Sequence, residues 1–553
     1  MNMNITPKVF WYQNLSGGMN QSTDNRLLEN NESPLLKNII LDRIGNWSSR
    51  KGTDLLGSVT VGSDRVWGLG TYDKSDGTHT FYRVVNRDLE EFNGTDTWSV
   101  EDTDEWTASK KVNMVNFLDR MYLGCEDGTT PLSYTTGGAI TDIVPTIGGH
   151  HLAVNKAILA VGGNNIQPNT IFFSKPNTDT FYDATGTCAA NADVAGANTV
   201  TTTAAIFEAY HEGAAYLYNS TEGVLRFITG FTSGTVVTTD GSTSTWDNDT
   251  VYVLIDYFTQ DNKCTGITSF NERFISFDED NMYQWDPAST WSNKMPGFGC
   301  VNERTIQEVN GNLIWVDREA VYLYDGSNRP MDISKKIKDA VDGFGLFDLI
   351  NPTNFGQLAA GSFDGKYYLS VGDLSTLSGA PASALTNVEF VFDMTSGVWT
   401  MNSRDDEPVV YSTYTNTSGS KDLYYGEKTN LAVYKMNIGT TDDDSAGAAG
   451  VISVEGRTQE YSFSDPTIEY RVSAFYVKYK AGGDVTITYS KNGGSYSALT
   501  TLSSSTTTTV EKILPRTECQ GFTHSLKFTS SSTMMIEAIG FLATPVSFGK
   551  VGM

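Results

Sequence analysis

A short sequence pattern, called here the tryptophan phrase, recurs along the chain and marks an internal repeat. In each of three copies an apolar run ends at a turn rich in Asp, Asn, Gly, Pro or Ser, and a tryptophan then opens the next run. Because these residues cap turns or tolerate unusual backbone angles, each copy predicts a β-hairpin with an aromatic anchor. The residues that bound the three copies, and that we expect to anchor their blades, are Phe92 and Trp98, Trp285 and Trp291, and Phe392 and Trp399.

A second phrase places a polar turn before an alternating or continuous apolar run. Its copies lie at residues 116–123, 154–161, 271–277, 310–316 and 364–371. The step from Phe274 to Leu313 is 39 residues and that from Leu313 to Tyr367 is 54, close to the roughly 40 to 50 residues of one propeller blade. The sequence therefore predicts an all-β protein whose body is a β-propeller of about seven blades, with six as the alternative.

One interval is too long for this rhythm. The step from Ala157 to Phe274 is 117 residues, which leaves about 75 beyond one blade. Short apolar runs separated by glycines fill residues 184–257, so we expect a small inserted β domain there, either as a docking element or as a decoration. The propeller then comprises residues 56–183 and 258–437.

The flanking segments differ from the body. Residues 1–55 are expected to form an N-terminal arm packed on the propeller, and residues 438–460 are polar and small enough to predict a linker. Runs about ten residues apart within 461–553 predict a C-terminal β-sandwich that makes subunit contacts, or else a carbohydrate-binding module. A single helix is predicted over residues 334–341, with Ser334 as its N-cap.

Charge and cysteine content narrow the functional classes. The net charge of −26 argues against tight binding to a phosphate backbone, which depends on Lys and Arg. It suits a conduit through which DNA passes without sticking, although solubility alone would also explain it. The five cysteines are odd in number and widely spaced, which disfavours a disulfide framework or a zinc ribbon. No apolar run is long enough to predict a membrane span or a secretory signal.

A catalytic constellation is not predicted. The five histidines are scattered apart from His150 and His151, and neighbours on a strand point to opposite faces, so we do not expect these two to hold one metal. Asp240 and the acidic run 278–280 are candidates for glycoside hydrolysis, which needs two carboxylates at a defined separation. The sequence accordingly predicts no catalytic residue, no cofactor and no metal site.

The first 55 residues carry the most distinctive linear pattern. An aromatic strand with Gly-Gly-Met-Asn lies within residues 10–20, Glu-Ser-Pro precedes Asn38 within 29–39, and Asp-Arg-Ile-Gly and Arg-Lys-Gly-Thr lie within 41–53. This order resembles the start of the tail nozzle, or tail tubular, proteins of short-tailed bacteriophages, a family built on a β-propeller. The motif covers about a tenth of the chain, and the blade rhythm extends the likeness over most of it.

The resemblance implies a structural role. In that family the N-terminal segment helps to close the propeller, and six copies form a tube below an adaptor ring. It therefore implies a non-enzymatic virion protein, made in the host cytoplasm, that assembles as a homohexamer, contacts tail adaptor and tail fibre proteins, and lets double-stranded DNA pass during ejection. A receptor- or glycan-binding propeller, or a propeller glycosidase, is the alternative.

Overall fold

The computed structural model describes most of the chain. The described residues are 6–546 apart from 43, 58–63, 129, 131, 194, 287–290, 339–344, 375–384, 417, 445, 464–465 and 516–518. The side chain of Trp291 also lies outside the described part. Within the described residues no helix is long and apolar enough to cross a bilayer.

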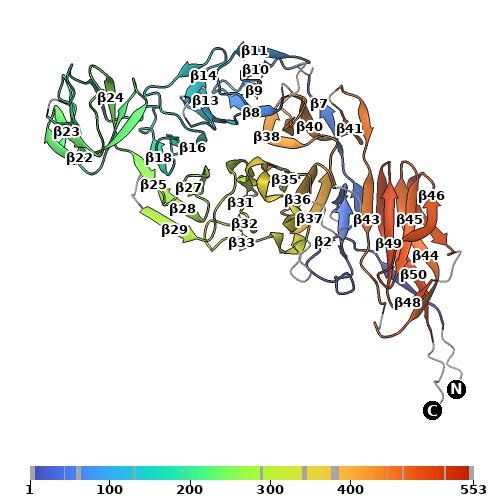
Figure 1. Ribbon diagram of the computed structural model, residues 1–553. Coiled ribbons are helices and arrows are strands. Elements are labelled where there is room, and N and C mark those ends of the chain that lie inside the picture. The colour runs from blue at the N-terminus through green and yellow to red at the C-terminus, as the bar shows by residue number, and fades with distance from the viewer. Residues whose placement is uncertain are drawn as a thin grey trace.

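Seven units of four antiparallel strands form the body of the molecule, and the prediction of an all-β propeller is confirmed (Figure 1). The first three blades are β8 (Val66–Asp73), β9 (His79–Val85), β10 (Asp88–Phe92) and β11 (Trp98–Asp102); β12 (Val112–Phe117), β13 (Arg120–Cys125), β14 (Ser133–Thr135) and β15 (Thr141–Asp142); and β16 (His151–Asn155), β17 (Ile158–Gly162), β18 (Thr170–Phe173) and β25 (Tyr257–Thr259). The next three are β26 (Gly266–Phe270), β27 (Arg273–Phe277), β28 (Asn281–Asp286) and β29 (Trp291–Pro296); β30 (Gln307–Val309), β31 (Asn312–Val316), β32 (Val321–Tyr324) and β33 (Met331–Asp332); and β34 (Ala359–Phe363), β35 (Lys366–Gly372), β36 (Val388–Asp393) and β37 (Val398–Ser403).

The seventh blade joins the two ends of the propeller. Its strands β38 (Pro408–Thr415), β39 (Lys421–Glu427) and β40 (Val433–Ile438) are completed by β7 (Gly52–Leu55), which comes from the N-terminal arm and pairs antiparallel with β40. β38 also contacts β8 of the first blade. The ring is therefore closed by strands that are far apart in sequence.

Seven separate hydrophobic cores lie between neighbouring blades, one for each junction. The core between the seventh and first blades, for example, joins Val409 and Tyr424 to Val66 and Phe81. Each sheet thus buries both of its faces only because a neighbour covers each one.

The polar-turn phrase marks the hairpin between the first and second strands of five consecutive blades. Each turn places two residues at positive φ between the strands: Leu118 and Asp119, Lys156 and Ala157, Asn271 and Glu272, Asn310 and Gly311, and Asp364 and Gly365. Two central residues at positive φ are the mark of the type I′ turn, whose twist matches that of the flanking strands.

The tryptophan phrase marks the hairpin between the third and fourth strands, and its aromatics tie blades together. Trp399 donates from Nε1 to the carbonyl of Ile333 in the fifth blade at 2.7 Å, and Trp98 donates to the carbonyl of Leu56, just after β7, at 3.2 Å. Ring centroids lie 5.3 Å apart for Phe92 and Trp98, 4.9 Å apart for Phe392 and Trp399, and 4.0 Å apart for Trp285 and Phe173 of the third blade.

A six-stranded sheet is inserted into the third blade, between β18 and β25. Its strands are β19 (Ala184–Thr187), β20 (Thr199–Thr201), β21 (Tyr216–Asn219), β22 (Val224–Ser233), β23 (Val236–Thr239) and β24 (Thr250–Leu254), with the 3₁₀ turn η1 (Ala209–His211). A bridge between Cys188 and Thr202 brings its two edge strands together, so the sheet curls on itself around a core that contains Trp246.

The C-terminal sandwich shares a sheet with the sixth blade. Beyond β37 the sheet continues through β4 (Leu35–Lys37), β43 (Val454–Arg457), β49 (His524–Ser530), β45 (Val485–Lys491) and β46 (Ser497–Leu502). A second sheet contains β47 (Ser505–Ile513), β44 (Tyr470–Ala481), β50 (Met534–Pro545), β6 (Trp47–Ser49) and β5 (Ile39–Leu41), with β1 (Lys8–Tyr12) paired to β50 and β48 (Cys519–Gly521) paired to β44. The N-terminal arm therefore contributes strands to the sandwich and also supplies β7 to the seventh blade. A separate two-stranded sheet in the arm pairs β2 (Gly18–Met19) with β3 (Glu32–Ser33).

Two local predictions are wrong. Residues 438–460, predicted as a linker, carry β41 (Thr441–Asp443), β42 (Ala449–Val451) and β43, because the polar Asp442 is buried against Arg50 of the arm rather than solvated. The predicted helix is only the 3₁₀ turn η3 (Ser334–Ile337), whose N-cap position is held by Ile333 rather than Ser334 and has no side-chain cap, and residues 339–341 of the prediction lie outside the described part. The other 3₁₀ turns are η2 (Glu303–Thr305), η4 (Phe347–Leu349) and η5 (Pro352–Gln357).

Arg50 is the main polar link at this seam. It donates to Asp442 Oδ1 at 2.8 Å, to Asn38 Oδ1 at 2.8 Å and to the carbonyl of Ser403 at 3.2 Å, and both charged side chains are buried. Burial acts to raise the pKa of Asp442, but the hydrogen bonds and charge of Arg50 outweigh it and lower that pKa. The stabilisation is therefore present above the ordinary carboxyl pKa and is lost as the pH falls through the lowered value.

We predict that Asp442→Ala lowers the free energy of unfolding by about 3–5 kcal/mol, because it leaves Arg50 buried without a counterion. Urea unfolding at neutral pH measures this loss. The matched control is Asp24→Ala, which breaks an exposed ion pair with Arg26 and should leave the unfolding curve unchanged. Equal effects of the two substitutions would contradict the assignment.

Candidate functional site

The first strands of all seven blades surround a cavity of about 200 Å³ at the centre of the propeller. Its lining residues are Leu69, Val112, Asn113, Met114, His151, Leu152, Ile267, Thr268, Glu303, Arg304, Ile306, Gln307, Ala360, Val410 and Tyr411. A cavity of this size holds a few water molecules, and sites for drug-sized ligands are larger, about 300–1,000 Å³.

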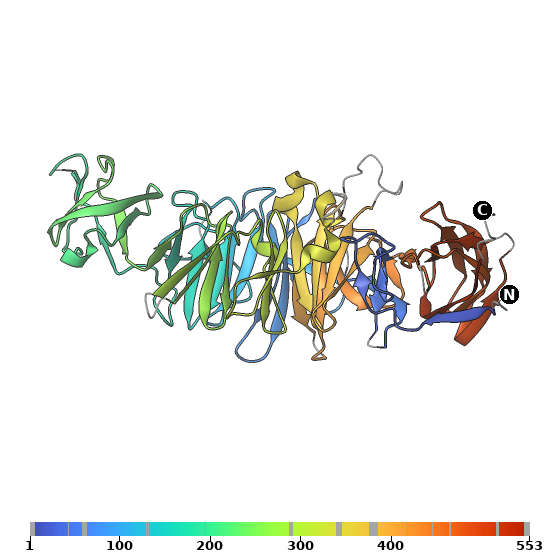
Figure 2. The ribbon, with the colours of Figure 1, turned by 90° about the horizontal axis from the view of Figure 1, so that it is seen from below.

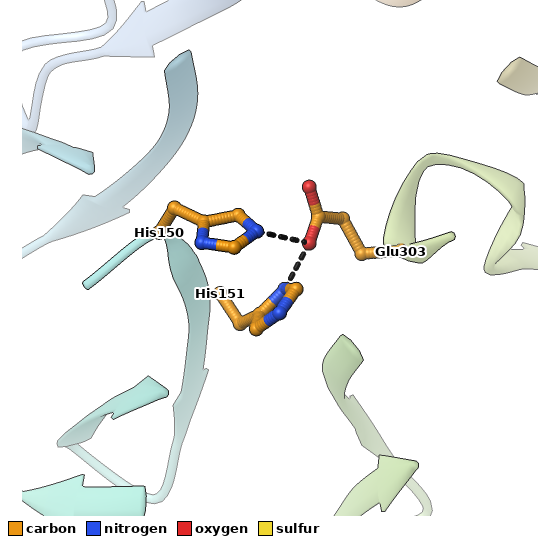
Figure 3. Close-up of side chains that lie close together, drawn as sticks. All are labelled: His150, His151 and Glu303. Carbon is orange, nitrogen blue, oxygen red and sulfur yellow. Dashed lines mark ion pairs between the residues drawn. The ribbon is translucent and has the colours of Figure 1, made fainter. Parts of the chain in front are cut away.

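Two imidazoles and one carboxylate meet beside this cavity (Figure 3), and two of the three residues, His151 and Glu303, line it. His151 begins β16 of the third blade and His150 precedes it, whereas Glu303 opens η2, the turn that leads into the fifth blade. Nε2 of His150 lies 3.3 Å from Oε2 of Glu303, and Nδ1 of His151 contacts the same oxygen. Both histidines are buried, and the Glu303 side chain is 11% exposed.

The expectation that His150 and His151 point to opposite faces is wrong. The strand begins only at His151, so the alternation of side chains that holds along a strand does not apply to His150. The two ring centroids lie 3.8 Å apart. Both rings therefore turn towards the same carboxylate.

Hydrogen bonds orient the side chains of His151 and Glu303. Nε2 of His151 lies 3.0 Å from the carbonyl oxygen of Cys264, and since a carbonyl can only accept, the network assigns the proton of His151 to Nε2. Asn113 donates from Nδ2 to Oε1 of Glu303 at 2.7 Å and to the carbonyl of His150 at 2.8 Å. Oε2 of Glu303 is thereby left for the two imidazoles.

Burial and charge oppose one another in this cluster. Desolvation is the largest effect on His151 and lowers its pKa, although Glu303 acts in the opposite sense. Burial acts to raise the pKa of Glu303, but the two imidazoles outweigh it and keep that pKa well below its ordinary value. At neutral pH the carboxylate is accordingly ionised.

Two buried cations lie beside the cluster and have partners of their own. Arg304 donates to the carbonyls of Val409, at 3.1 Å, and Trp67, and burial lowers its pKa to about 10. Nζ of Lys111 donates to the carbonyl of Gly356 at 2.5 Å and lies 3.6 Å from Glu126, and burial lowers its pKa. The partners of these two cations do not include Oε2 of Glu303.

The acidic residues considered for hydrolysis do not join this site. Asp278 is buried, and its Oδ1 accepts from the backbone N–H groups of Asp280 and Asn281 at 2.8 and 2.6 Å, while its Oδ2 accepts from the Tyr283 hydroxyl at 2.8 Å. Asp240 lies in the inserted sheet and accepts from the backbone N–H of Phe227 at 2.9 Å. Each holds its own turn, and the two are on different modules.

Sequence reasoning missed Glu303 altogether, and the aromatic anchors lie in the outer hairpins rather than at the centre. A local signal existed in the run Cys300 to Arg304, where a charged pair interrupts an apolar connection between blades. This local signal could not identify the partner of Glu303, because His151 is distant in the sequence and comes near only when the propeller ring closes.

Comparison with known proteins found similarity of fold alone. No protein-family model and no curated protein matches the chain. Three solved structures are similar to it: YCF48 from Cyanidioschyzon merolae (10% identity, 69% of this chain and 98% of that one, TM-score 0.34), a catalytically inactive virginiamycin B lyase from Staphylococcus aureus with quinupristin (9%, 70% and 99%, 0.36) and Sqt1 from Saccharomyces cerevisiae (7%, 70% and 99%, 0.34). The class that the strand order defines is a seven-bladed β-propeller with an inserted sheet and a terminal sandwich.

Gly163 sits where the two imidazoles leave no room. Its φ is +74°, and a Cβ there would lie 2.7 Å from Nδ1 of His150 and 2.8 Å from Cδ2 of His151. We predict that Gly163→Ala lowers the free energy of unfolding by about 1–3 kcal/mol more than Gly311→Ala does, because overpacking adds to backbone strain. Gly311 has φ +73° and open space around its Cβ position, so urea unfolding of the two variants isolates the steric term. Equal losses would contradict this packing.

Proposed function

We propose that the chain is a structural subunit of a virion, the nozzle of a short phage tail, and that it acts through its outer surfaces rather than through its centre. The observation that carries this proposal is the placement of the two extra modules. The inserted sheet and the terminal sandwich project from opposite edges of the propeller disc, close to its plane (Figures 1 and 2). A subunit shaped in this way has two lateral arms for its neighbours.

The two arms differ in charge. Residues 184–257 contain one basic residue, Arg226, and eight acidic ones: Asp193, Glu208, Glu212, Glu222, Asp240, Asp247, Asp249 and Asp256. Residues 461–553 contain eight basic and six acidic residues. Opposite charge on two different patches favours a head-to-tail contact, and head-to-tail contacts generate rings when the rotation closes.

The arms are also joined firmly to the body. The sandwich shares a continuous nine-stranded sheet with the sixth blade, and the inserted sheet leaves and re-enters the third blade through β18 and β25. A fixed angle between the two arms supports a ring of defined copy number. By the resemblance of the N-terminal arm we propose six copies, below an adaptor ring and in contact with tail fibre proteins.

Double-stranded DNA would pass between the copies and not through any one propeller. The central cavity, surrounded by the seven first strands, has a volume of only about 200 Å³, so it offers no path for a duplex. A net charge of −26 would repel the DNA backbone from the lumen wall during ejection. This proposal assigns the chain no catalytic step.

We expect native mass spectrometry and electron microscopy of the recombinant full chain, or of virions that contain it, to show a closed ring of six copies. The combination Glu212→Lys with Glu222→Lys, at exposed positions of the inserted sheet, should shift the population from rings to single folded chains. The matched control reverses two exposed turn residues of the propeller, Glu272 and Glu319, and should keep the ring. A chain that stays monomeric at every concentration and is absent from purified virions would refute the proposal.

A further inference from the structure

The geometry points to a site for a divalent transition-metal ion of the zinc class, held by Nε2 of His150, Nδ1 of His151 and Oε2 of Glu303. These three atoms lie within 4.8 Å of one another. Two neutral imidazole nitrogens and one carboxylate oxygen are a donor set that Zn²⁺ takes in proteins, with a water in the fourth position. This site is independent of the proposed assembly role.

Both imidazoles converge on a single oxygen of the Glu303 carboxylate. With the His151 proton on Nε2, where it meets the carbonyl of Cys264, the lone pair of Nδ1 faces the lone pairs of the Glu303 carboxylate. Nε2 of His150 approaches the same oxygen. A metal ion between these three atoms would bind a lone pair of each imidazole and of the carboxylate.

The spacing of His150 and Glu303 suits such an ion, whereas Nδ1 of His151 lies closer to the carboxylate and would move apart from it on binding. Zinc binds nitrogen and oxygen at about 2.0–2.2 Å in tetrahedral geometry, which sets its ligands roughly 3.3–3.5 Å apart. The gap between His150 Nε2 and Glu303 Oε2 is 3.3 Å. His151 and Glu303 also line the central cavity, which leaves room for a water as the fourth ligand.

The outer contacts are those that a metal-binding histidine and carboxylate need. The carbonyl of Cys264 holds the Nε2–H of His151, and the Asn113 amide holds Oε1 of Glu303. Groups of this kind orient the ligands, and their loss typically costs about 10–100-fold in metal affinity. His150 has no such partner, since its Nδ1 makes no hydrogen bond among the described residues.

The neighbouring cations do not fill the site. The guanidinium of Arg304 turns to the carbonyls of Val409 and Trp67, and Lys111 lies beside Glu126. Their repulsion makes the Glu303 carboxylate essential to binding, because two neutral imidazoles alone would offer no compensating charge. An ion here would clamp the third blade to the fifth across the fourth.

The test is a Zn²⁺ titration of the metal-stripped full-length chain, with bound metal counted by elemental mass spectrometry and the thermal midpoint followed. We expect one ion per chain and a midpoint that rises with Zn²⁺. Glu303→Gln should abolish binding, and Asn113→Ala should weaken it about 10–100-fold. His79→Gln is the matched control, since His79 pairs with Asp73 on an exposed hairpin, and it should bind as the parent does.

Cobalt substitution supplies a readout that needs no variant. Co²⁺ bound to the parent chain should give visible absorption bands of a four- or five-coordinate site, and X-ray absorption should show two imidazole ligands. A folded parent chain that binds no Zn²⁺ or Co²⁺ would overturn the proposal and leave a proton alone in the cluster. Binding that Glu303→Gln retains at full affinity, with circular dichroism showing a folded variant, would overturn it as well.

Discussion

The structure depends on a single constraint: no blade can cover its own two faces. Each four-stranded sheet is apolar on both sides, and the seven cores between blades exist only when each sheet has a neighbour on either side. An open row of blades would expose one apolar face of each terminal blade to water, so closure of the ring is a condition of stability. Here β7 from the N-terminal arm meets β40, and Arg50 fixes the arm to the seam.

The same closure creates the central cluster. His151 and Glu303 belong to different blades and converge because the first strands of all blades line one axis. A ring thus brings together polar groups that no short segment of the chain contains. The His151 ring is held by the carbonyl of Cys264 and the Glu303 carboxylate by the Asn113 amide, and these buried contacts orient both groups.

The architecture was predictable from sequence where its signals are local. Pairs such as Asn310 and Gly311 indicate a turn through their own backbone preference, and pairs of positive-φ residues recur in five consecutive blades. Pairings between distant strands leave no such mark, so β1, β5 and β6 could not be assigned to the sandwich, and Asp442 fell within the predicted linker. Glu303 was not predicted as a site residue, because its partner His151 belongs to another blade.

The pairing of early strands with late ones has a consequence for synthesis on the ribosome. β1 finds its partner in β50, β4 in β43 and β7 in β40, so the first strands to emerge must wait for nearly the whole chain. At about 5–20 residues per second this delay amounts to tens of seconds. During that time side chains of the arm that end up buried, such as Leu36, Ile39 and Trp47, have no partner strand to cover them.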